Sequence, residues 1–180
     1  IDGEVARLGK LVEDLLLLSR LDAKRTEAGQ ERFEVNRLVE SLQREYAGKA
    51  AEKRIDFQVQ LPEKGLPVAA NVNHMRIVFG NVLNNAFKYT PEGGMVNVVL
   101  SNGGDMAQLE VRDSGRGIAP EELPHIGQRF YRTDKARSRQ NTPGIGLGLA
   151  LAGSILELYD GRFSVNSIGL EQGTTGTVCW

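Results

Sequence analysis

The hydrophobic pattern of this chain changes its period several times, and the order of these changes constrains the fold most strongly. Four segments have the spacing of helices that bury one face: residues 4–23, 35–46, 73–89 and 147–159. Five segments have strand character: residues 55–61, 95–101, 107–113, 162–167 and 174–180. This order predicts an α+β fold, a sandwich in which helices cover one face of a mixed sheet.

Length and composition indicate one domain, or one domain with a short appendage. The 180 residues include 22 basic and 23 acidic ones, a net charge of −1, which excludes a strongly basic nucleic-acid platform. The single cysteine, Cys179, excludes an internal disulfide framework and a multi-cysteine zinc site. Since we find neither a targeting segment nor about 20 consecutive apolar residues, we expect no membrane contact in this fragment.

The helix predicted over residues 4–23 has apolar groups almost all round its axis, because residues 15–18 are four consecutive leucines. Such a helix needs several neighbours in water. It is either a core helix of this chain or a member of a helical bundle that another chain completes. A polar stretch with Gly29 follows it. The predicted division is therefore a helix at 1–24, a linker at 25–32 and a globular domain at 33–180.

Turn and cap residues predict where several elements begin and end. Asn36 is a candidate N-cap for the helix that follows it, and Thr90 with Pro91 ends the helix over residues 73–89. Residues 102–105, Asn-Gly-Gly-Asp, predict a hairpin turn between two strands. We also expect a short helix near Glu121, inside a long glycine- and arginine-rich loop.

The helix predicted over residues 73–89 has a polar stripe beside its apolar one. Asn81, Asn85 and Lys88 follow one another at i, i+4 and i+7, so their side chains project from one face. Two carboxamides and an ammonium in line suit a magnesium–polyphosphate, which needs oxygen donors for the cation and positive charge for the phosphates. Taken alone, the stripe is also typical of a solvated helix face.

Two glycine-rich segments supply further candidates for ligand binding. In residues 113–118, a carboxylate at a strand end precedes two glycines and could accept a hydrogen bond from an amine such as that of adenine. In residues 143–150, three alternate glycines open an apolar helix, whose N-terminal N–H groups attract a phosphate. The second segment is neither a dinucleotide fingerprint nor a P-loop. An ordinary turn and a flexible loop are the simpler alternatives.

A basic segment lies between these two glycine-rich segments. Residues 129–139 contain five basic residues and one acidic residue, a local charge of +4 in a nearly neutral chain. Such a loop, flanked by glycines, is typical of a mobile lid that senses phosphates. A solvated charged loop is the alternative.

Together, in this order and spacing, the segments resemble the catalytic and ATP-binding domain of sensor histidine kinases, in the Bergerat-fold ATPase superfamily. Five segments are similar to its motifs: the N-box at 81–91, the first glycine box at 113–118, the Phe box and lid start at 122–134, the second glycine box at 144–149 and the terminal Gly-Thr-Thr at 173–175. Residues 18–22, Leu-Ser-Arg-Leu-Asp, resemble the end of the second helix of the dimerisation and histidine-phosphotransfer hairpin. The resemblance implies a two-layer α/β sandwich with a mixed, mostly antiparallel sheet and one preceding bundle-type helix.

The resemblance also implies a role for each matching residue, with ATP and Mg²⁺ as cofactors. Asn85 would ligate Mg²⁺, and Asp113 would accept the adenine amine with support from the hydroxyl of Thr174. The catalytic residues would be Asn81, Lys88 and Arg132, with Arg129 as a further candidate. The nucleotide would be bound by Asn85, Lys88, Tyr89, Asp113, Gly115, Gly117, Gly144, Gly146, Gly148 and Thr174.

The implied activity is transfer of the ATP γ-phosphoryl group to a histidine and then to an aspartate of a response regulator. The implied partners are the receiver domain of that regulator and the hairpin helices, in the same full-length chain or in a separate polypeptide. No nucleic-acid partner is expected, and the implied location is cytoplasmic. Asn81 favours transfer over hydrolysis, because related hydrolases have Glu there and Asn cannot act as a general base.

The chain departs from the family pattern at several positions. Its two histidines, His74 and His125, lie outside the bundle-type helix and are expected to be structural or surface residues, so the acceptor histidine would lie outside this chain. Gly127 stands where the family has its first Phe, which affects lid packing. Three more departures should affect packing more than chemistry: Asn71, Ile77 and Gly176. Two other functions stay open, a degenerate nucleotide-binding regulatory module and a serine kinase of the anti-sigma type.

Overall fold

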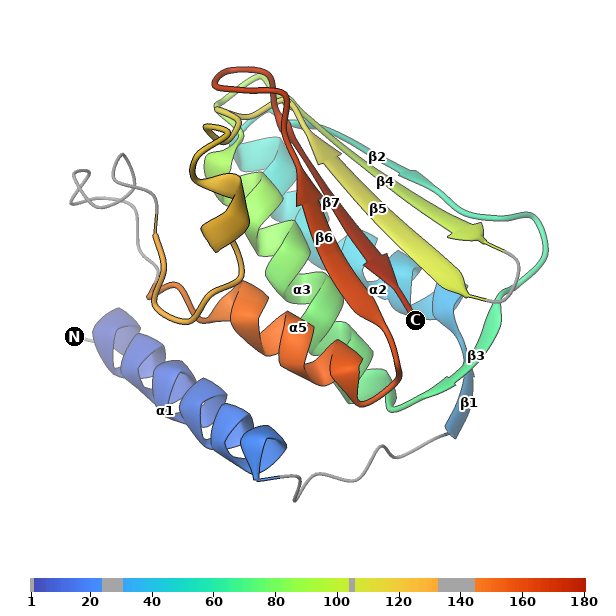
Figure 1. The fold of residues 1–180 in the computed structure, drawn as a ribbon. Helices are drawn as coiled ribbons and strands as arrows, with labels where there is room; N and C mark the ends of the chain where they lie inside the picture. Colours follow the sequence, from blue (N-terminus) through green and yellow to red (C-terminus); the bar gives the residue numbers. More distant parts are fainter. Residues whose placement is uncertain (1, 24–30, 104–105, 133–144) are drawn as a thin grey trace.

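The fold is an α+β sandwich built on one five-stranded sheet (Figure 1). The computed structural model describes residues 2–23, 31–103, 106–132 and 145–180. The strands of this sheet are β2 (Asp56–Gln60), β4 (Met95–Asn102), β5 (Ala107–Asp113), β6 (Arg162–Asn166) and β7 (Thr174–Cys179). Their order is β2-β4-β5-β7-β6, with β2 parallel to β4 and every other pair antiparallel. The predicted mixed, mostly antiparallel sheet is therefore confirmed.

The helices lie on one face of this sheet, as predicted (Figure 1). They are α2 (Val35–Glu52), α3 (Val72–Tyr89) and α5 (Gly148–Glu157), with the short 3₁₀ helix η1 (Leu123–His125) near the position expected for it. The first helix, α1 (Asp2–Asp22), packs against α5 on the side away from the sheet. In the described ranges, each helix is either too short or too polar to cross a membrane.

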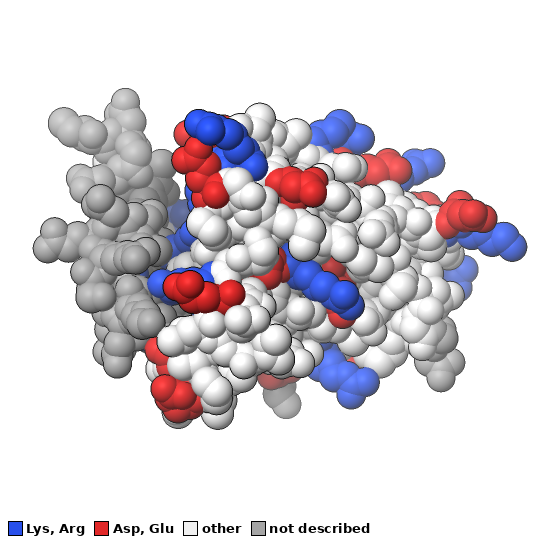
Figure 2. Space-filling model, turned by 90° about the horizontal axis from the view of Figure 1, so that it is seen from above, with Lys and Arg blue, Asp and Glu red and all other residues white. Residues whose placement is uncertain are grey.

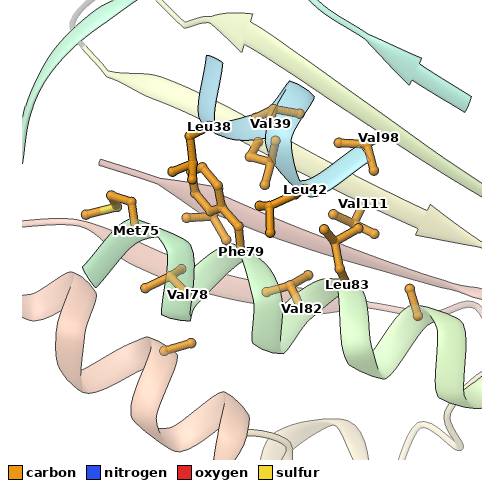
Figure 3. Close-up of a cluster of buried hydrophobic side chains, with 14 of the residues drawn as sticks. Leu38, Val39, Leu42, Met75, Val78, Phe79, Val82, Leu83, Val98 and Val111 are labelled. Atoms are coloured by element: carbon orange, nitrogen blue, oxygen red, sulfur yellow. The ribbon is translucent and has the colours of Figure 1, made fainter. Parts of the chain in front are cut away.

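The core fills the space between the helices and the sheet. The apolar stripe of α3 is buried, as its spacing predicts, and includes Met75, Val78, Phe79, Val82 and Ala86. Figure 3 shows side chains of α2, α3 and the sheet converging there. Because a fully buried side chain of this size contributes roughly 1.5–3 kcal/mol, this stripe fixes the rotation of α3 about its axis. The orientation of the polar stripe of the same helix, Asn81, Asn85 and Lys88, is therefore fixed as well.

Both ends of α3 are held by side-chain hydrogen bonds. The carboxamide oxygen of Asn71 accepts two N–H groups of the first turn, at 2.9 and 3.2 Å. At the other end the hydroxyl of Thr90 donates to the carbonyl of Ala86 at 2.7 Å. The ammonium of Lys53 donates to the carbonyl of Phe87 at 2.6 Å, as expected for a cation at a helix C-terminus. Asn71 therefore serves as a helix cap.

The helix α1 has one packed face and one exposed apolar face. Leu18 and Leu21 are buried, with 2% and 7% of their surfaces exposed. In contrast, Val5 and Leu8 are 63% and 61% exposed. One face of α1 thus packs as a core helix would, while its other face keeps the character expected of a bundle member.

A second, two-stranded sheet was not predicted. Strands β1 (Glu31–Glu34) and β3 (Pro67–Ala70) pair antiparallel. Each has four residues, too few to show alternation, and β3 begins with a proline. Glu31 and Arg32, assigned to the linker from the sequence, belong to β1. Residues 24–30 lie outside the described part of the chain.

The prediction that Asn36 caps α2 was wrong. The helix begins at Val35, with Glu34 at the N-cap position and no side-chain hydrogen bond there. The carboxamide of Asn36 instead donates to the carbonyl of Pro62 at 3.2 Å and accepts the N–H of Leu66 at 3.1 Å. The carboxamide that would have capped the helix is therefore used in a tertiary contact with the loop after β2.

The predicted hairpin is confirmed where it can be followed. Strands β4 and β5 pair antiparallel up to Asn102 opposite Ala107, and the N–H of Gly103 donates to the carbonyl of Met106 at 2.9 Å. Residues 104–105 of the turn lie outside the described ranges. Acidic and basic side chains are interspersed on the face seen in Figure 2, in line with the balanced composition.

Candidate functional site

A cavity of about 450 Å³ brings together ten of the twelve residues predicted for the site. These ten are Asn81, Asn85, Lys88, Tyr89, Asp113, Gly117, Arg132, Gly146, Gly148 and Thr174. Gly115 is absent from the lining, and Gly144 lies outside the described residues. The volume is within the range of small-molecule sites. The roles of these residues stay predictions, but segments far apart in the chain do meet around one hollow.

One end of the cavity is built where α3 meets the start of α5. A Cβ atom placed on Gly148 would lie 2.6 Å from Oδ1 of Asn81, so a larger residue would displace this carboxamide from its position. Gly148 is also the first residue of α5, whose first N–H groups have no partner within the helix. This end therefore combines a carboxamide with the N–H groups and positive dipole end of a helix, an arrangement suited to an anion.

The other end of the cavity is built around Asp113. The last pair of the β5–β7 register places this residue opposite Thr174. Burial raises the pKa of Asp113 to about 6, although the backbone N–H groups of Gly115 and Thr174 both act to lower it. The N–H of Gly115 donates to Oδ1 of Asp113 at 2.8 Å. A ligand that donates a hydrogen bond would stabilise the ionised form of this buried carboxylate.

Two glycines shape the loop around this carboxylate. A Cβ atom on Gly115 would lie 2.7 Å from the carbonyl oxygen of Tyr89, so the loop passes close to the end of α3. Gly115 therefore contacts Asp113 and Tyr89 rather than the cavity, which explains its absence from the cavity lining. Gly117 has a φ of +64°, and a Cβ atom there would collide with the carbonyl of Gly169. The β6–β7 loop thus fixes the shape of the first glycine box.

Tyr89, which lines the cavity, contacts two cations through its ring. Its ring centroid is 4.9 Å from Nζ of Lys88 and 4.1 Å from Cζ of Arg116. Both distances are typical of cation–π contacts. Arg116 also lines the cavity and was not singled out from the sequence. Its position between two glycines after a strand is the signal that could have identified it.

Apolar side chains form much of the remaining lining of the cavity. They include Val82, Ala86, Val111, Ile118, Ile126, Ile145, Leu147, Leu149, Phe163 and Val165. A surface of this kind accommodates a flat apolar group such as a purine ring. The ring of Phe163 lies 3.5 Å from the position that a Cβ atom on Gly176 would take. Phe163 thus occupies part of the space that the aromatic residue of the family pattern would need at position 176.

Helix α1 also contributes to the lining, through Lys10, Leu11 and Asp14. The sequence placed α1 in a separate unit, and nothing in its local pattern marks these residues. Their place in the site follows from tertiary packing alone.

Arg129, the further candidate for a catalytic role, does not line the cavity and contacts α1 instead. Its guanidinium donates to both carboxylate oxygens of Asp22, at 2.7 and 2.5 Å. The hydrogen bond from Arg129 lowers the pKa of Asp22. This pair ties the beginning of the predicted lid to the end of α1. The basic residues Lys135, Arg137 and Arg139 of the lid lie outside the described residues.

Gly127, the departure in the Phe box, has a φ of +91°. This left-handed conformation favours glycine. No atom lies within 4 Å of the position that its Cβ would take, so backbone strain rather than crowding disfavours Phe there. Gly127 lines the cavity, and the neighbouring lid segment is held through Arg129.

The donor set fits a magnesium ion that arrives with its nucleotide. In the described ranges we find no group of three or more His, Cys, Asp or Glu residues that could hold a metal by themselves. The carboxamides of Asn81 and Asn85 lie one turn apart on the same wall. Mg²⁺ binds through one or two protein ligands together with substrate phosphates, which is what this wall offers.

The two histidines do not line the cavity and contact aromatic side chains. Nδ1 of His74 lies 2.7 Å from the hydroxyl of Tyr159, and burial lowers the pKa of His74. The ring of His125 packs 5.3 Å from that of Tyr131. His74 is half-buried and His125 is exposed, in line with the expectation that they are structural or surface residues.

Comparison with known proteins supports the resemblance to sensor histidine kinases. The sequence model of the family described as "Histidine kinase-, DNA gyrase B-, and HSP90-like ATPase" matches residues 70–180, which include all of the predicted motifs. The sensor histidine kinase RppB of Synechocystis sp. is 36% identical over 178 residues, 99% of this chain and 39% of RppB. The chain thus spans about two fifths of the length of that relative.

Solved structures are similar over nearly the whole chain, α1 included. Full-length ShkA in complex with AMPPNP gives a TM-score of 0.82 at 28% identity, covering 96% of this chain and 35% of ShkA. Histidine kinase ThkA in complex with the response regulator protein TrrA gives a TM-score of 0.76 at 21% identity, covering 99% of this chain and 48% of ThkA, a likeness of fold. The chain therefore belongs to the histidine kinase-, DNA gyrase B- and HSP90-like ATPase family, and within it to the catalytic, ATP-binding domains of sensor histidine kinases.

Proposed function

We propose that the cavity binds magnesium–ATP and that the domain transfers the γ-phosphoryl group to a histidine imidazole outside this chain. One observation carries this proposal: a single cavity joins the carboxamides of Asn81 and Asn85 to the buried carboxylate of Asp113. The two ends differ in chemistry as the two ends of ATP do. One attracts phosphates, and the other accepts a hydrogen bond.

At the Asp113 end the adenine would lie against the apolar wall, with its amine donating to the carboxylate. The raised pKa indicates that this carboxylate is poorly solvated in the free protein. A hydrogen bond from the adenine amine would replace the water that the buried carboxylate lacks. The same contact would therefore contribute both affinity and specificity for adenine. Gly115 keeps the carboxylate in place through its N–H group.

At the α5 end the triphosphate would lie near Asn81, Lys88 and Arg132. The incoming imidazole nitrogen forms a bond to the γ-phosphorus while the bond to the β–γ bridging oxygen breaks, and ADP leaves. Catalysis of this kind depends on alignment and charge neutralisation, which Lys88 and Arg132 would supply. Because a carboxamide cannot remove a proton from water, Asn81 would limit hydrolysis. Magnesium, when bound at Asn85, would neutralise charge on the phosphate oxygens.

The acceptor and the next partner lie outside this chain. Helix α1 contains no histidine and resembles one helix of the phosphotransfer hairpin, so we propose that hairpin helices of the full-length chain or of a separate polypeptide supply the acceptor. A response regulator receiver domain would then take the phosphoryl group on an aspartate. The solved complex of ThkA with the response regulator TrrA supports this partner class. Since ATP and receiver domains are cytoplasmic, we place the domain there.

The experiment mixes this chain with a hairpin-domain protein that carries the acceptor histidine and adds γ-labelled ATP. We expect label on the hairpin protein that is labile in acid and stable in alkali, as phosphohistidine is. Acid-stable label would indicate a serine kinase. Bound ATP without any transfer would indicate a nucleotide-binding regulatory module, which Gly127 in the Phe box would favour.

A further inference from the structure

Helix α1 reaches into the nucleotide cavity, where Lys10 and Asp14 take part in the lining. Three contacts hold α1 in this position. Leu18 and Leu21 are buried in the core cluster, and Asp22 accepts two hydrogen bonds from Arg129. Lys10 lies about three turns before this anchored end, since a helical turn takes 3.6 residues.

Packing indicates which end of the cavity Lys10 approaches. Helix α1 packs against α5, and α5 begins at Gly148, beside the carboxamide of Asn81. Asp113 and Thr174 belong to the sheet, on the other side of the helix layer (Figure 1). Lys10 therefore comes from the direction of the phosphate end.

Lys10 has a partner that a phosphate can replace. Its Nζ lies 3.2 Å from Oδ1 of Asp14, one turn further along the helix. The lysine side chain is 63% exposed and the aspartate only 18%, so the ammonium faces solvent while the carboxylate lies against the protein. A pair this accessible is weak, because solvent screens it. A polyphosphate with Mg²⁺ still carries net negative charge and offers the ammonium a stronger acceptor.

We propose that Lys10 is a phosphate-binding residue of the nucleotide site, supplied by α1, and that it exchanges Asp14 for the terminal phosphate of bound ATP. This inference rests on the proposed function, since it assigns a contact to the same nucleotide. Lys10 would then favour ATP over ADP, because only ATP carries the phosphate at that end. Asp14 would oppose the contact by competing for the ammonium.

The test is calorimetric titration of the full chain with AMPPNP and with ADP, in the presence of Mg²⁺. Lys10→Gln should weaken AMPPNP binding about tenfold, the effect of losing one charge-assisted contact, and change ADP binding less than about twofold. Asp14→Asn should strengthen AMPPNP binding, since the competing carboxylate is gone. Arg20→Gln is the matched control, because it removes a cation from the same helix at an exposed position outside the cavity lining.

The outcomes separate this inference from the function beneath it. Equal affinity of the Lys10→Gln and Arg20→Gln variants for AMPPNP would overturn the role of Lys10 while leaving the nucleotide site intact. Equal weakening of AMPPNP and ADP in Lys10→Gln would also overturn it, because a general change in α1 packing affects both ligands. If the unmodified chain bound neither ligand, the proposed function itself would be contradicted.

Discussion

We expect nucleotide affinity to depend on pH, because Asp113 is proposed to accept a hydrogen bond from the adenine amine. Burial raises its pKa from an ordinary 3.8 to about 6, so the carboxyl is neutral in moderately acidic solution and ionised at pH 7. In the proposed contact the adenine amine would donate to the ionised form, which is the stronger acceptor. ADP affinity, measured by titration between pH 5 and 8, should therefore rise up to about tenfold per unit below pH 6 and level off above it. A flat profile, or one equal to that of Asp113→Asn, would contradict this assignment.

The same carboxyl has the opposite effect on stability. Because its pKa is raised in the folded state, its contribution to the free energy of unfolding is fully present below pH 3.8 and is lost as pH rises through about 6. Asp113→Asn should therefore raise the thermal unfolding temperature of the ligand-free chain more at pH 8 than at pH 5. Asp160→Asn, at an exposed aspartate, is the control and should change the temperature equally at both values.

Substitution of Gly148 tests the α5 end of the cavity, where we propose that the phosphates bind. An alanine Cβ there would lie 2.6 Å from Oδ1 of Asn81 and push the carboxamide away. We expect Gly148→Ala to reduce the rate of phosphotransfer by about ten- to a hundredfold, because alignment of the reacting groups is lost. Gly153→Ala, in the same helix with no atom within 4 Å of its Cβ, should keep the rate and gain about 0.5–1 kcal/mol of stability. Similar rates for both variants would contradict this role.

At the scale of elements, α1 is held by its C-terminal half. Leu18 is 2% exposed and Leu8 is 61% exposed on the same helix. Leu18→Ala should weaken the packing of α1 by about 2–3 kcal/mol, seen as roughly 30- to 150-fold faster hydrogen exchange in α1 with little change in β5. Leu8→Ala should change exchange rates little. Equal effects of the two substitutions would show that α1 does not pack on α5 as described.

The ends of α3 show why some elements are easily predicted and others are not. Helix α3 is long, has a full apolar stripe and has its cap at Asn71 and its stop at Thr90, so local rules determine it. Asn36 has the same capping chemistry, yet its carboxamide binds the loop at Pro62 and Leu66, a contact 26–30 residues away. Strands of four residues, such as β1, depend on their partner rather than on their own pattern.

At the scale of the whole molecule, the sequence predicts the sandwich and most of the site. The residues predicted to carry chemistry lie in short segments with local signals, the polar stripe of α3 and the glycine boxes, and the fold brings these segments together around one cavity. The part of the site that α1 supplies could not be predicted. Lys10 and Asp14 reach the cavity because tertiary contacts hold α1 beside it. These contacts are made by Leu18, Leu21 and the Asp22–Arg129 pair.

The central claim is that one cavity holds a nucleotide between the carboxamides of α3 and the carboxylate of Asp113. Calorimetric titration with ADP and Mg²⁺ tests it most directly, on the unmodified chain and on Asp113→Asn. We expect clear binding to the unmodified chain and a loss of at least about a hundredfold in the variant, since a buried acceptor read by the ligand is removed. Unchanged ADP affinity in Asp113→Asn, or no binding to either protein, would contradict the account.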